Sequence, residues 1–290
     1  MSARAPWNQK LGMVTRLSRI FREDGRALII AADHRQRGIQ GGLEDFKSLT
    51  RRMYGALGQA DAIVTTKEPM ATLISAHPAS RRKGLLLSLN RAGLGGSVFE
   101  VDDRPVNSPA MASRWGLDGT KFLLRIDPAN PHTASQLETC GKLCEECASL
   151  ELPMIIEPLF CRESGGKLTV DTSPERVRYA AIIANDYSVP AIKIPYPKGS
   201  TRSKRRRDFR DIVASVSSRV LILGGSRTRI DQVLAQAEDS IREGGSGVVM
   251  GRNILLHDRP EMVTSALGMI IHDDLDAETA LRKAREDVED

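Results

Sequence analysis

Short runs of apolar residues recur along the chain, and each run ends in polar residues. Within a run, apolar positions do not alternate with polar ones, which is typical of parallel strands covered on both faces. The intervals between runs leave room for a helix between each pair of strands. We predict eight strands, at 27–34, 62–66, 85–89, 122–127, 154–159, 191–196, 220–225 and 247–251.

The segments between these runs carry apolar residues at helical spacing. Ser173 followed by Pro174 is typical of a helix start, because proline suits the first helical position. Gly244 and Gly245 follow another such segment and indicate a helix end. We predict helices at 7–21, 43–57, 133–150, 174–185, 230–243, 260–272 and 277–287.

Eight strand–helix repeats predict an α/β protein and favour a (β/α)8 TIM barrel. An open doubly wound sheet is the alternative, but it usually carries a glycine-rich turn after its first strand. Here that strand ends in Asp33 and His34, and the glycine-rich turns come late. We predict one barrel domain over residues 1–290, with an N-terminal helix and a C-terminal helical extension. The long connection 90–120 is expected to hold a partial helix or a lid.

Composition indicates a globular protein of the cytoplasm. The 290 residues are 41% hydrophobic and 27% charged, and no run reaches the roughly 18 apolar residues that span a bilayer. The N-terminal segment is polar and lacks the apolar core of a signal peptide. Four cysteines are too few for a disulfide framework in a chain of this length. We therefore expect a cytoplasmic protein that does not bind a membrane.

Part of the formal net charge of +5 lies in one basic run, 202–207 (RSKRRR). Such a run is most simply a solvated loop or helix start, and phosphate recognition and nucleic-acid binding are the alternatives. No aromatic residue interleaves the run, so base stacking would contribute little. We predict no nucleic-acid partner.

One lysine, Lys193, interrupts the apolar run 191–196. Burial of a charged lysine is energetically unfavourable unless it forms an ion pair or takes part in catalysis. Burial also favours the neutral amine, which can attack a ketone and form a Schiff base. In barrel enzymes the catalytic residues lie at the C-terminal ends of the strands. Glu157 and Asp33 also lie toward the ends of predicted strands. Glu157 would be well placed to transfer protons beside a protonated imine. Lys193, Glu157 and Asp33 are the candidate catalytic residues, with structural ion pairing as the alternative for each.

Two glycine motifs, 224–226 and 251–253, follow the last two predicted strands. Loops at these places in a barrel often bind phosphate through backbone N–H groups, and an arginine can add a bidentate contact. Ordinary turns are the alternative. The predicted phosphate site consists of Gly224, Gly225, Ser226, Gly251 and Arg252.

Two patterns that could indicate a metal are better explained otherwise. Cys140, Cys144 and Cys147 have the spacing of some iron–sulfur enzymes, but they lie inside a helical pattern as small residues of a core stripe. A zinc aldolase needs several neighbouring histidines, and of five in the chain only His34 lies at a predicted strand end. We predict no metal and no cofactor.

Taken together, the motifs resemble the DeoC/LacD-type class I aldolases, which include archaeal-type fructose-bisphosphate and tagatose-bisphosphate aldolases. The resemblance runs in order from about 27 to 281. It implies a (β/α)8 barrel, a homo-oligomer, a Schiff base on Lys193, no metal, and a substrate phosphate on the last two strand-end loops. The segments that carry it are Asp33-His34, Gly38, 42–45, 193–196, 224–226 and 251–253.

Comparison with the branches of this family implies further roles. The segment 121–125 resembles the strand-4 lysine segment of the tagatose-bisphosphate branch, and Glu157 matches that branch's strand-5 glutamate. The archaeal-type branch uses a tyrosine after strand 5 as proton donor, but 159–162 reads Leu-Phe-Cys-Arg here, so Glu157 is the expected donor. His34, Lys121 and Arg125 are expected to contact the substrate.

The sequence therefore predicts a metal-independent class I aldolase that cleaves or forms a carbon–carbon bond in a phosphorylated keto sugar or a related keto compound. A barrel isomerase, or another phosphosugar-binding protein without aldolase activity, is the alternative. The motifs do not specify the sugar.

Overall fold

Eight parallel strands close into a barrel, as predicted, in the computed structural model, which describes residues 10–37, 43–90, 102–164 and 167–287. Each strand pairs with its neighbours in the ring, and the pairings of β1 with β9 and of β4 with β5 complete the closure. The strands are β1 (Ala27–Ala32), β2 (Ala62–Thr65), β3 (Gly84–Ser88), β4 (Gly119–Ile126), β5 (Met154–Ser164), β7 (Ala191–Ile194), β8 (Arg219–Leu223) and β9 (Gly247–Met250).

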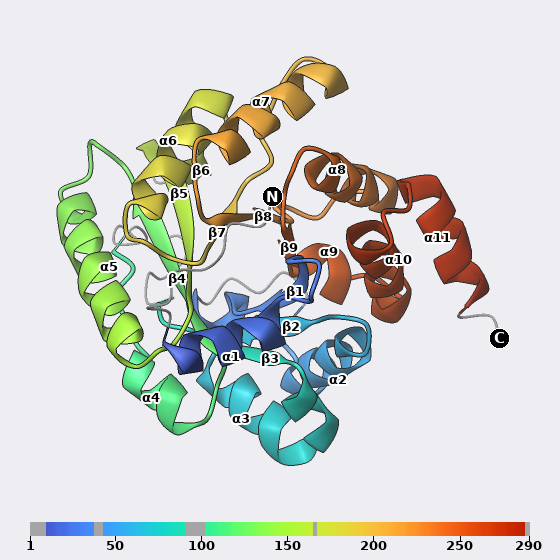
Figure 1. Cartoon of the computed structure of the whole chain (residues 1–290), viewed down its shortest axis with the longest axis horizontal. Coiled ribbons are helices and arrows are strands. Elements are labelled where there is room, and N and C mark those ends of the chain that lie inside the picture. Colours follow the sequence, from blue (N-terminus) through green and yellow to red (C-terminus); the bar gives the residue numbers. More distant parts are fainter. Residues whose placement is uncertain (1–9, 38–42, 91–101, 165–166, 288–290) are drawn as a thin grey trace.

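Helices surround this barrel, and Figure 1 shows them outside the ring of strands. The helix α11 packs against α10 and α8 beyond the last strand. No described helix is long and apolar enough to cross a bilayer. The α-helices are α1 (Leu11–Ile20), α2 (Phe46–Leu57), α3 (Lys67–Ala76), α4 (Pro109–Arg114), α5 (His132–Ser149), α6 (Pro174–Asn185), α7 (Arg202–Ala214), α8 (Ile230–Arg242), α9 (Arg252–Leu255), α10 (Pro260–His272) and α11 (Ala277–Glu286). Two short 3-10 helices, η1 (His34–Arg37) and η2 (Pro78–Arg82), follow β1 and α3.

The core has two layers because the strands of the barrel are buried on both faces. Ile29, Val64 and Leu221 belong to a cluster inside the barrel, whereas Leu28 and Ile63 belong to the larger cluster between strands and helices. This double burial explains why the strand segments are apolar without alternation. A charged residue at an inward position is therefore surrounded by protein on all sides.

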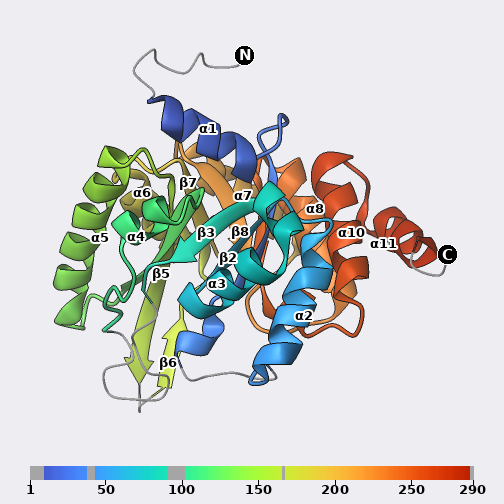
Figure 2. The same cartoon turned by 90° about the horizontal axis from the view of Figure 1, so that it is seen from below.

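One strand and several short helices were not predicted. The strand β5 continues past residue 159 and pairs antiparallel with β6 (Lys167–Val170), so the two form a hairpin. Figure 2 shows this hairpin projecting from the end of the barrel opposite α1. The helix α3 begins immediately after β2, and α4 supplies the partial helix expected in the 90–120 connection. The prediction of one domain over 1–290 stays a prediction, because part of that range lies outside the described residues.

The cysteines of α5 follow the predicted core stripe. Cys140 and Cys147 are buried, and Cys144 packs partly buried against the same cluster. Burial raises the pKa of the Cys147 thiol to about 12, so the thiol stays protonated. The structural interpretation of these cysteines is confirmed.

Candidate active site

A buried network of charges lies at inward positions toward the C-terminal ends of the strands. Nζ of Lys193 on β7 is 3.1 Å from Oε1 of Glu157 on β5. The other carboxylate oxygen of Glu157 is 2.5 Å from Nζ of Lys121 on β4. Lys193 is 4% exposed and Glu157 is 5% exposed, so the carboxylate bridges two lysines away from bulk water.

Asp33, directly after β1, extends the network across the barrel. Its Oδ2 is 3.1 Å from Nζ of Lys121 and accepts a hydrogen bond from the Ser88 hydroxyl at 2.9 Å. Asp33 is completely buried and Lys121 is 1% exposed. Each buried charge faces an opposite charge, which is the condition under which burial of ionised groups is tolerated. The predicted catalytic residues therefore lie in one connected network, together with Lys121.

His34 lies beside this network, on the side of the glycine loops. Its Nδ1 is 3.9 Å from Oδ1 of Asp33. The loop after β9 approaches closely because Gly251 has no side chain: a Cβ there would collide with the Ala31 carbonyl oxygen and lie 2.9 Å from Cε1 of His34. The structure thus brings His34 and the predicted phosphate loop together.

The two glycine loops are tied to each other. Arg252 donates from Nη2 to the Gly225 carbonyl at 3.0 Å. The Asn253 amide donates to the carbonyls of Gly224 and Ser226 at 2.5 and 3.4 Å. Gly225 has a φ of +62°, a left-handed conformation that glycine adopts without strain. The five residues of the predicted phosphate site therefore form one connected rim.

Arg125 is engaged by a carboxylate that was not expected. Its Nε and Nη2 both donate to Asp103, and both side chains are buried. Asp103 belongs to the connection after β3, which the Asn90 amide also holds through a 3.3 Å hydrogen bond to the Asp103 carbonyl. In this arrangement the Arg125 guanidinium holds the connection between β3 and β4 against the mouth of the barrel. The expected contact of Arg125 with the substrate stays a prediction.

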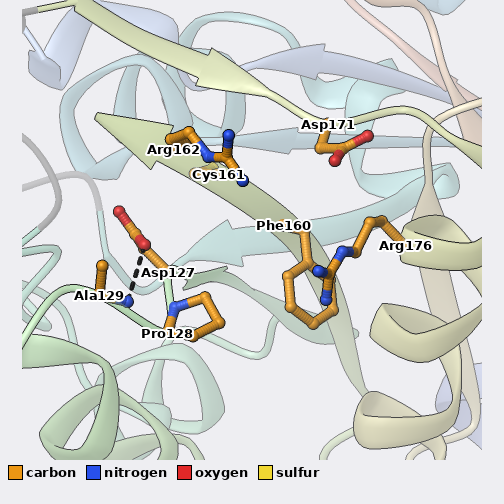
Figure 3. A pocket seen from close by; sticks show the side chains of 8 residues that line it. All are labelled: Asp127, Pro128, Ala129, Phe160, Cys161, Arg162, Asp171 and Arg176. Carbon is orange, nitrogen blue, oxygen red and sulfur yellow. Dashed lines mark hydrogen bonds between the residues drawn. The ribbon is translucent and has the colours of Figure 1, made fainter. Parts of the chain in front are cut away.

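A hollow of about 450 Å³ lies beside the β5–β6 hairpin, but Lys193, Glu157 and Asp33 do not line it. Figure 3 shows Arg176 stacked beside the Phe160 ring, with the guanidinium carbon 5.1 Å from the ring centre. The side chains of Asp127, Arg162 and Asp171 also line this hollow. The residues that line this hollow carry both positive and negative charges, and none of them belongs to the buried network. We therefore take the buried network, and not this hollow, as the candidate active site.

Two residues of the site, Ser88 and Asp103, were missed, and Asn253 belonged to the predicted motif 251–253 without a role assigned to it. Ser88 lies one residue before the end of the predicted strand 85–89, and Asn253 follows Gly251 and Arg252 directly, so their positions could have indicated their roles. Asp103 lies in a connection without periodicity, and nothing local indicates it. Among the described residues, no three His, Cys, Asp or Glu side chains are grouped as a metal ion requires.

Comparisons with known proteins cover nearly the whole chain. The 2-amino-3,7-dideoxy-D-threo-hept-6-ulosonate synthase 1 of Archaeoglobus fulgidus is 28% identical over 271 residues, covering 93% of this chain and 95% of that protein. The class 1 fructose-bisphosphate aldolase of Halobacterium salinarum is 24% identical over 278 residues, covering 89% and 95%. The crystal structure of Cgl0159 from Corynebacterium glutamicum superposes with a TM-score of 0.79 at 26% identity, covering 91% of this chain and 93% of that one.

The family described as Cgl0159-like matches residues 25–270, which include every strand and all the residues of the buried network and the glycine loops. The chain belongs to the Cgl0159-like family, among the DeoC/LacD-type class I aldolases that its motifs resemble.

Proposed function

We propose that this class I aldolase uses Lys193 to make or break a carbon–carbon bond in a phosphorylated keto sugar or a related keto compound. The observation that carries the proposal is the buried contact of 3.1 Å between Nζ of Lys193 and Glu157. A buried amine beside a carboxylate combines a nucleophile with a group that can exchange protons during imine formation.

The reaction in the cleavage direction follows from these groups. Lys193 first gives a proton to Glu157, and the neutral amine attacks the C2 carbonyl. Glu157 then returns this proton to the hydroxyl of the carbinolamine, which leaves as water, so that an iminium ion forms and Glu157 is again a carboxylate. The C3–C4 bond then breaks: its electron pair moves toward the iminium nitrogen to form an enamine, while the C4 hydroxyl loses its proton to Glu157. Protonation of the enamine at C3 and hydrolysis of the new imine release the second product and restore the lysine.

The remaining residues of the network hold Glu157 in place. Lys121 contacts two carboxylates, Asp33 at 3.1 Å and Glu157 at 2.5 Å, and is thus an ion-pair partner of both. Lys193 lies at the longer distance from Glu157. We therefore assign nucleophilic attack to Lys193 and positioning to Lys121, with Asp33 as a second carboxylate for proton transfer.

The glycine loops supply the anion site. The rim formed by 224–226 and 251–252 presents backbone N–H groups, and Arg252 and His34 lie at the same side of the barrel mouth. This arrangement suits a phosphate group held near the buried lysine. The names of the two curated relatives, a heptulosonate synthase and a fructose-bisphosphate aldolase, both denote keto compounds and support this substrate class. A homo-oligomer and a cytoplasmic location stay predictions.

Borohydride trapping tests the proposal. With dihydroxyacetone phosphate and borohydride, we expect a covalent adduct on the peptide that contains Lys193 and none on the peptide that contains Lys121, which serves as an internal control. Lys193→Met should lose the adduct and turnover together. If no ketose phosphate gives an adduct, or if Lys193→Met turns over the true substrate at the wild-type rate, the protein is instead an isomerase or a binding protein on the same fold.

A further inference from the structure

A second hollow of about 610 Å³ lies beyond the C-terminal end of β7, between α7 and α8. Figure 1 shows these two helices outside β7 and β8. Tyr196, which lines the hollow, packs against Phe209 of α7 with ring centres 5.2 Å apart, whereas Lys193 pairs with Glu157. None of the residues that line the hollow belongs to the buried network or to the glycine loops, so the hollow is distinct from the candidate active site. Its volume is in the range of small-molecule sites.

The Tyr196 hydroxyl is a buried polar group without a hydrogen-bond partner in the described part of the chain. The residue is 8% exposed. Burial, and then the nearby Asp239 carboxylate, raise the pKa of Tyr196, so the phenol stays protonated and can donate a hydrogen bond. Buried hydroxyls are nearly always paired, and Tyr196 is among the residues that line the hollow, so a ligand group that accepts a hydrogen bond there would satisfy this one.

The lining carries an excess of positive charge. Lys198, Arg202 and Arg205 line the hollow, against a single carboxylate, Asp239. Arg202 is paired with Asp239 at 2.8 Å. Arg205 donates to a backbone carbonyl at 3.3 Å, and no carboxylate of the described residues forms an ion pair with Arg205 or Lys198. Two cations therefore face the hollow without a compensating anion.

The backbone at the start of α7 adds to the positive electrostatic potential in the hollow. The helix α7 has 13 residues and begins at the hollow, where the Thr201 side chain accepts a hydrogen bond from the Lys204 N–H at 3.1 Å. Unpaired N–H groups in the first turn and the helix dipole favour an anion at this end. A phenol donor, two cations and a helix start thus converge on one space.

We propose that this hollow binds the phosphate group of a small phosphorylated compound, at a site that shares no residue with the buried network or the glycine loops. A tetrahedral dianion can accept hydrogen bonds from Tyr196, Arg205 and Lys198 together, and such charge-assisted bonds are stronger than neutral ones. Gln236 and Asp239 on α8 are placed to contact hydroxyl groups of the same ligand.

Calorimetric titration with glycerol 3-phosphate tests this site directly. The probe lacks a carbonyl group and cannot form a Schiff base, so the outcome is independent of the proposed aldolase reaction. We expect two saturable sites in the wild-type protein. Arg205→Gln should weaken one of them about tenfold or more, and Arg252→Gln should weaken the other. Arg207→Gln is the matched control: it removes the same charge from an exposed position of α7 that does not line the hollow, and it should change neither site more than about twofold.

Tyr196→Phe provides a second readout, thermal melting with and without the probe. Because this substitution removes an unpartnered hydroxyl, the unliganded variant should melt at the wild-type temperature or above, while the stabilisation by glycerol 3-phosphate should shrink. Equal weakening by Arg205→Gln and Arg207→Gln, a single site abolished by Arg252→Gln, or no saturable binding at millimolar probe would each overturn the proposal. An unchanged ligand shift in Tyr196→Phe would do so as well.

Discussion

Glu157 is the residue on which both the buried network and the proposed chemistry depend. Each of its carboxylate oxygens contacts a different lysine, at 3.1 Å for Lys193 and 2.5 Å for Lys121. Without the carboxylate, two buried amines would lie near each other with Asp33 as the remaining anion of the network. Since uncompensated buried charge is strongly unfavourable, the same contact that supports proton transfer also stabilises the fold.

The substitution Glu157→Gln should separate these two roles. We expect kcat to fall by about 10²- to 10⁴-fold, because the amide cannot exchange protons, while borohydride still traps an adduct on Lys193, more slowly than in the wild type. The free energy of unfolding should fall by about 3–5 kcal/mol, because Lys121 and Lys193 lose their shared partner. Steady-state kinetics, trapping and urea denaturation measure the three effects.

Asp33→Asn is the matched control for Glu157, since it removes the other carboxylate that contacts Lys121. It should also destabilise the protein but should lower kcat less. If Asp33→Asn reduced kcat as strongly as Glu157→Gln, with trapping intact in both, proton transfer could not be assigned to Glu157 in particular.

At the scale of elements, the basic run 202–207 forms the first turns of α7, as the interpretation of a helix start predicted. Arg202 and Arg206 of the run, and Arg210 after it, face acidic residues of α8 and of the segment that follows α8. Arg206 and Arg210 each contact Glu243 at 2.5 Å, and Arg202 contacts Asp239. These ion pairs join α7 to α8 and to the segment that follows it, and the expectation of no nucleic-acid partner stays a prediction.

Glu243→Gln should weaken this junction. Burial raises the pKa of Glu243, but hydrogen bonds from Arg210 and Arg206 outweigh burial and lower the pKa below its ordinary value of 4.5. The ionised carboxylate therefore stabilises the fold above about pH 4.5, and the contribution is lost as pH falls through the lowered pKa. At neutral pH we expect a loss of about 1–3 kcal/mol in urea denaturation, because both arginines are partly solvated.

The control for Glu243 is Glu286→Gln on α11. Arg282 and Glu286 form an ion pair at 3.1 Å in which both side chains are exposed. Removal of such a pair should cost less than about 0.5 kcal/mol. Losses of equal size in the two variants would contradict the structural role assigned to the α7–α8 junction.

At the scale of the whole molecule, His272 joins the end of α10 to the beginning of the barrel. Its Nδ1 is 2.7 Å from Asp24, and its Nε2 is 2.9 Å from Asp61. Asp61 in turn accepts hydrogen bonds from the Leu28 N–H and from Arg22. One buried imidazole thus links segments that are 211 and 248 residues apart in the chain.

This junction predicts a window of pH for maximal stability. Burial alone would lower the pKa of His272, but hydrogen bonds to Asp61 and Asp24 outweigh it and raise the pKa above 6.5. The contribution of the imidazolium is therefore complete below pH 6.5 and is lost as pH rises through the raised pKa. Burial raises the pKa of Asp61, but the hydrogen bonds from His272 and Leu28 lower it below 3.8, so its contribution is lost only at acid pH.

Thermal melting of wild type and His272→Gln across pH checks this prediction. The variant should be less stable by about 1–3 kcal/mol between pH 3.8 and 6.5, and the difference should shrink at higher pH as the wild-type imidazolium loses its proton. A difference that stayed constant, or that grew, from pH 6.5 upward would show that the charged imidazole does not stabilise the junction.

Sequence patterns predicted the barrel because parallel strands and amphipathic helices each have a strong local signature. The helices α6 and α10 begin and end where the sequence predicted, and both have a proline in the first turn. The strand β6 was missed because it belongs to a ribbon outside the barrel, with no long apolar run. The helix α3 was missed because it follows β2 without a turn signal between them.

The sequence by itself determined the fold class. It also identified the residues whose burial is energetically unfavourable, because a lysine or glutamate inside an apolar strand is visible locally, as are paired glycines that follow such a strand. Only the tertiary structure decided which charges meet. Lys121 and Asp33 are 88 residues apart and touch because the ring closes, and Arg125 meets Asp103 through a connection without any pattern. A local pattern specifies the face of the strand toward which a side chain points, but the side chain that it meets there depends on how distant strands pack.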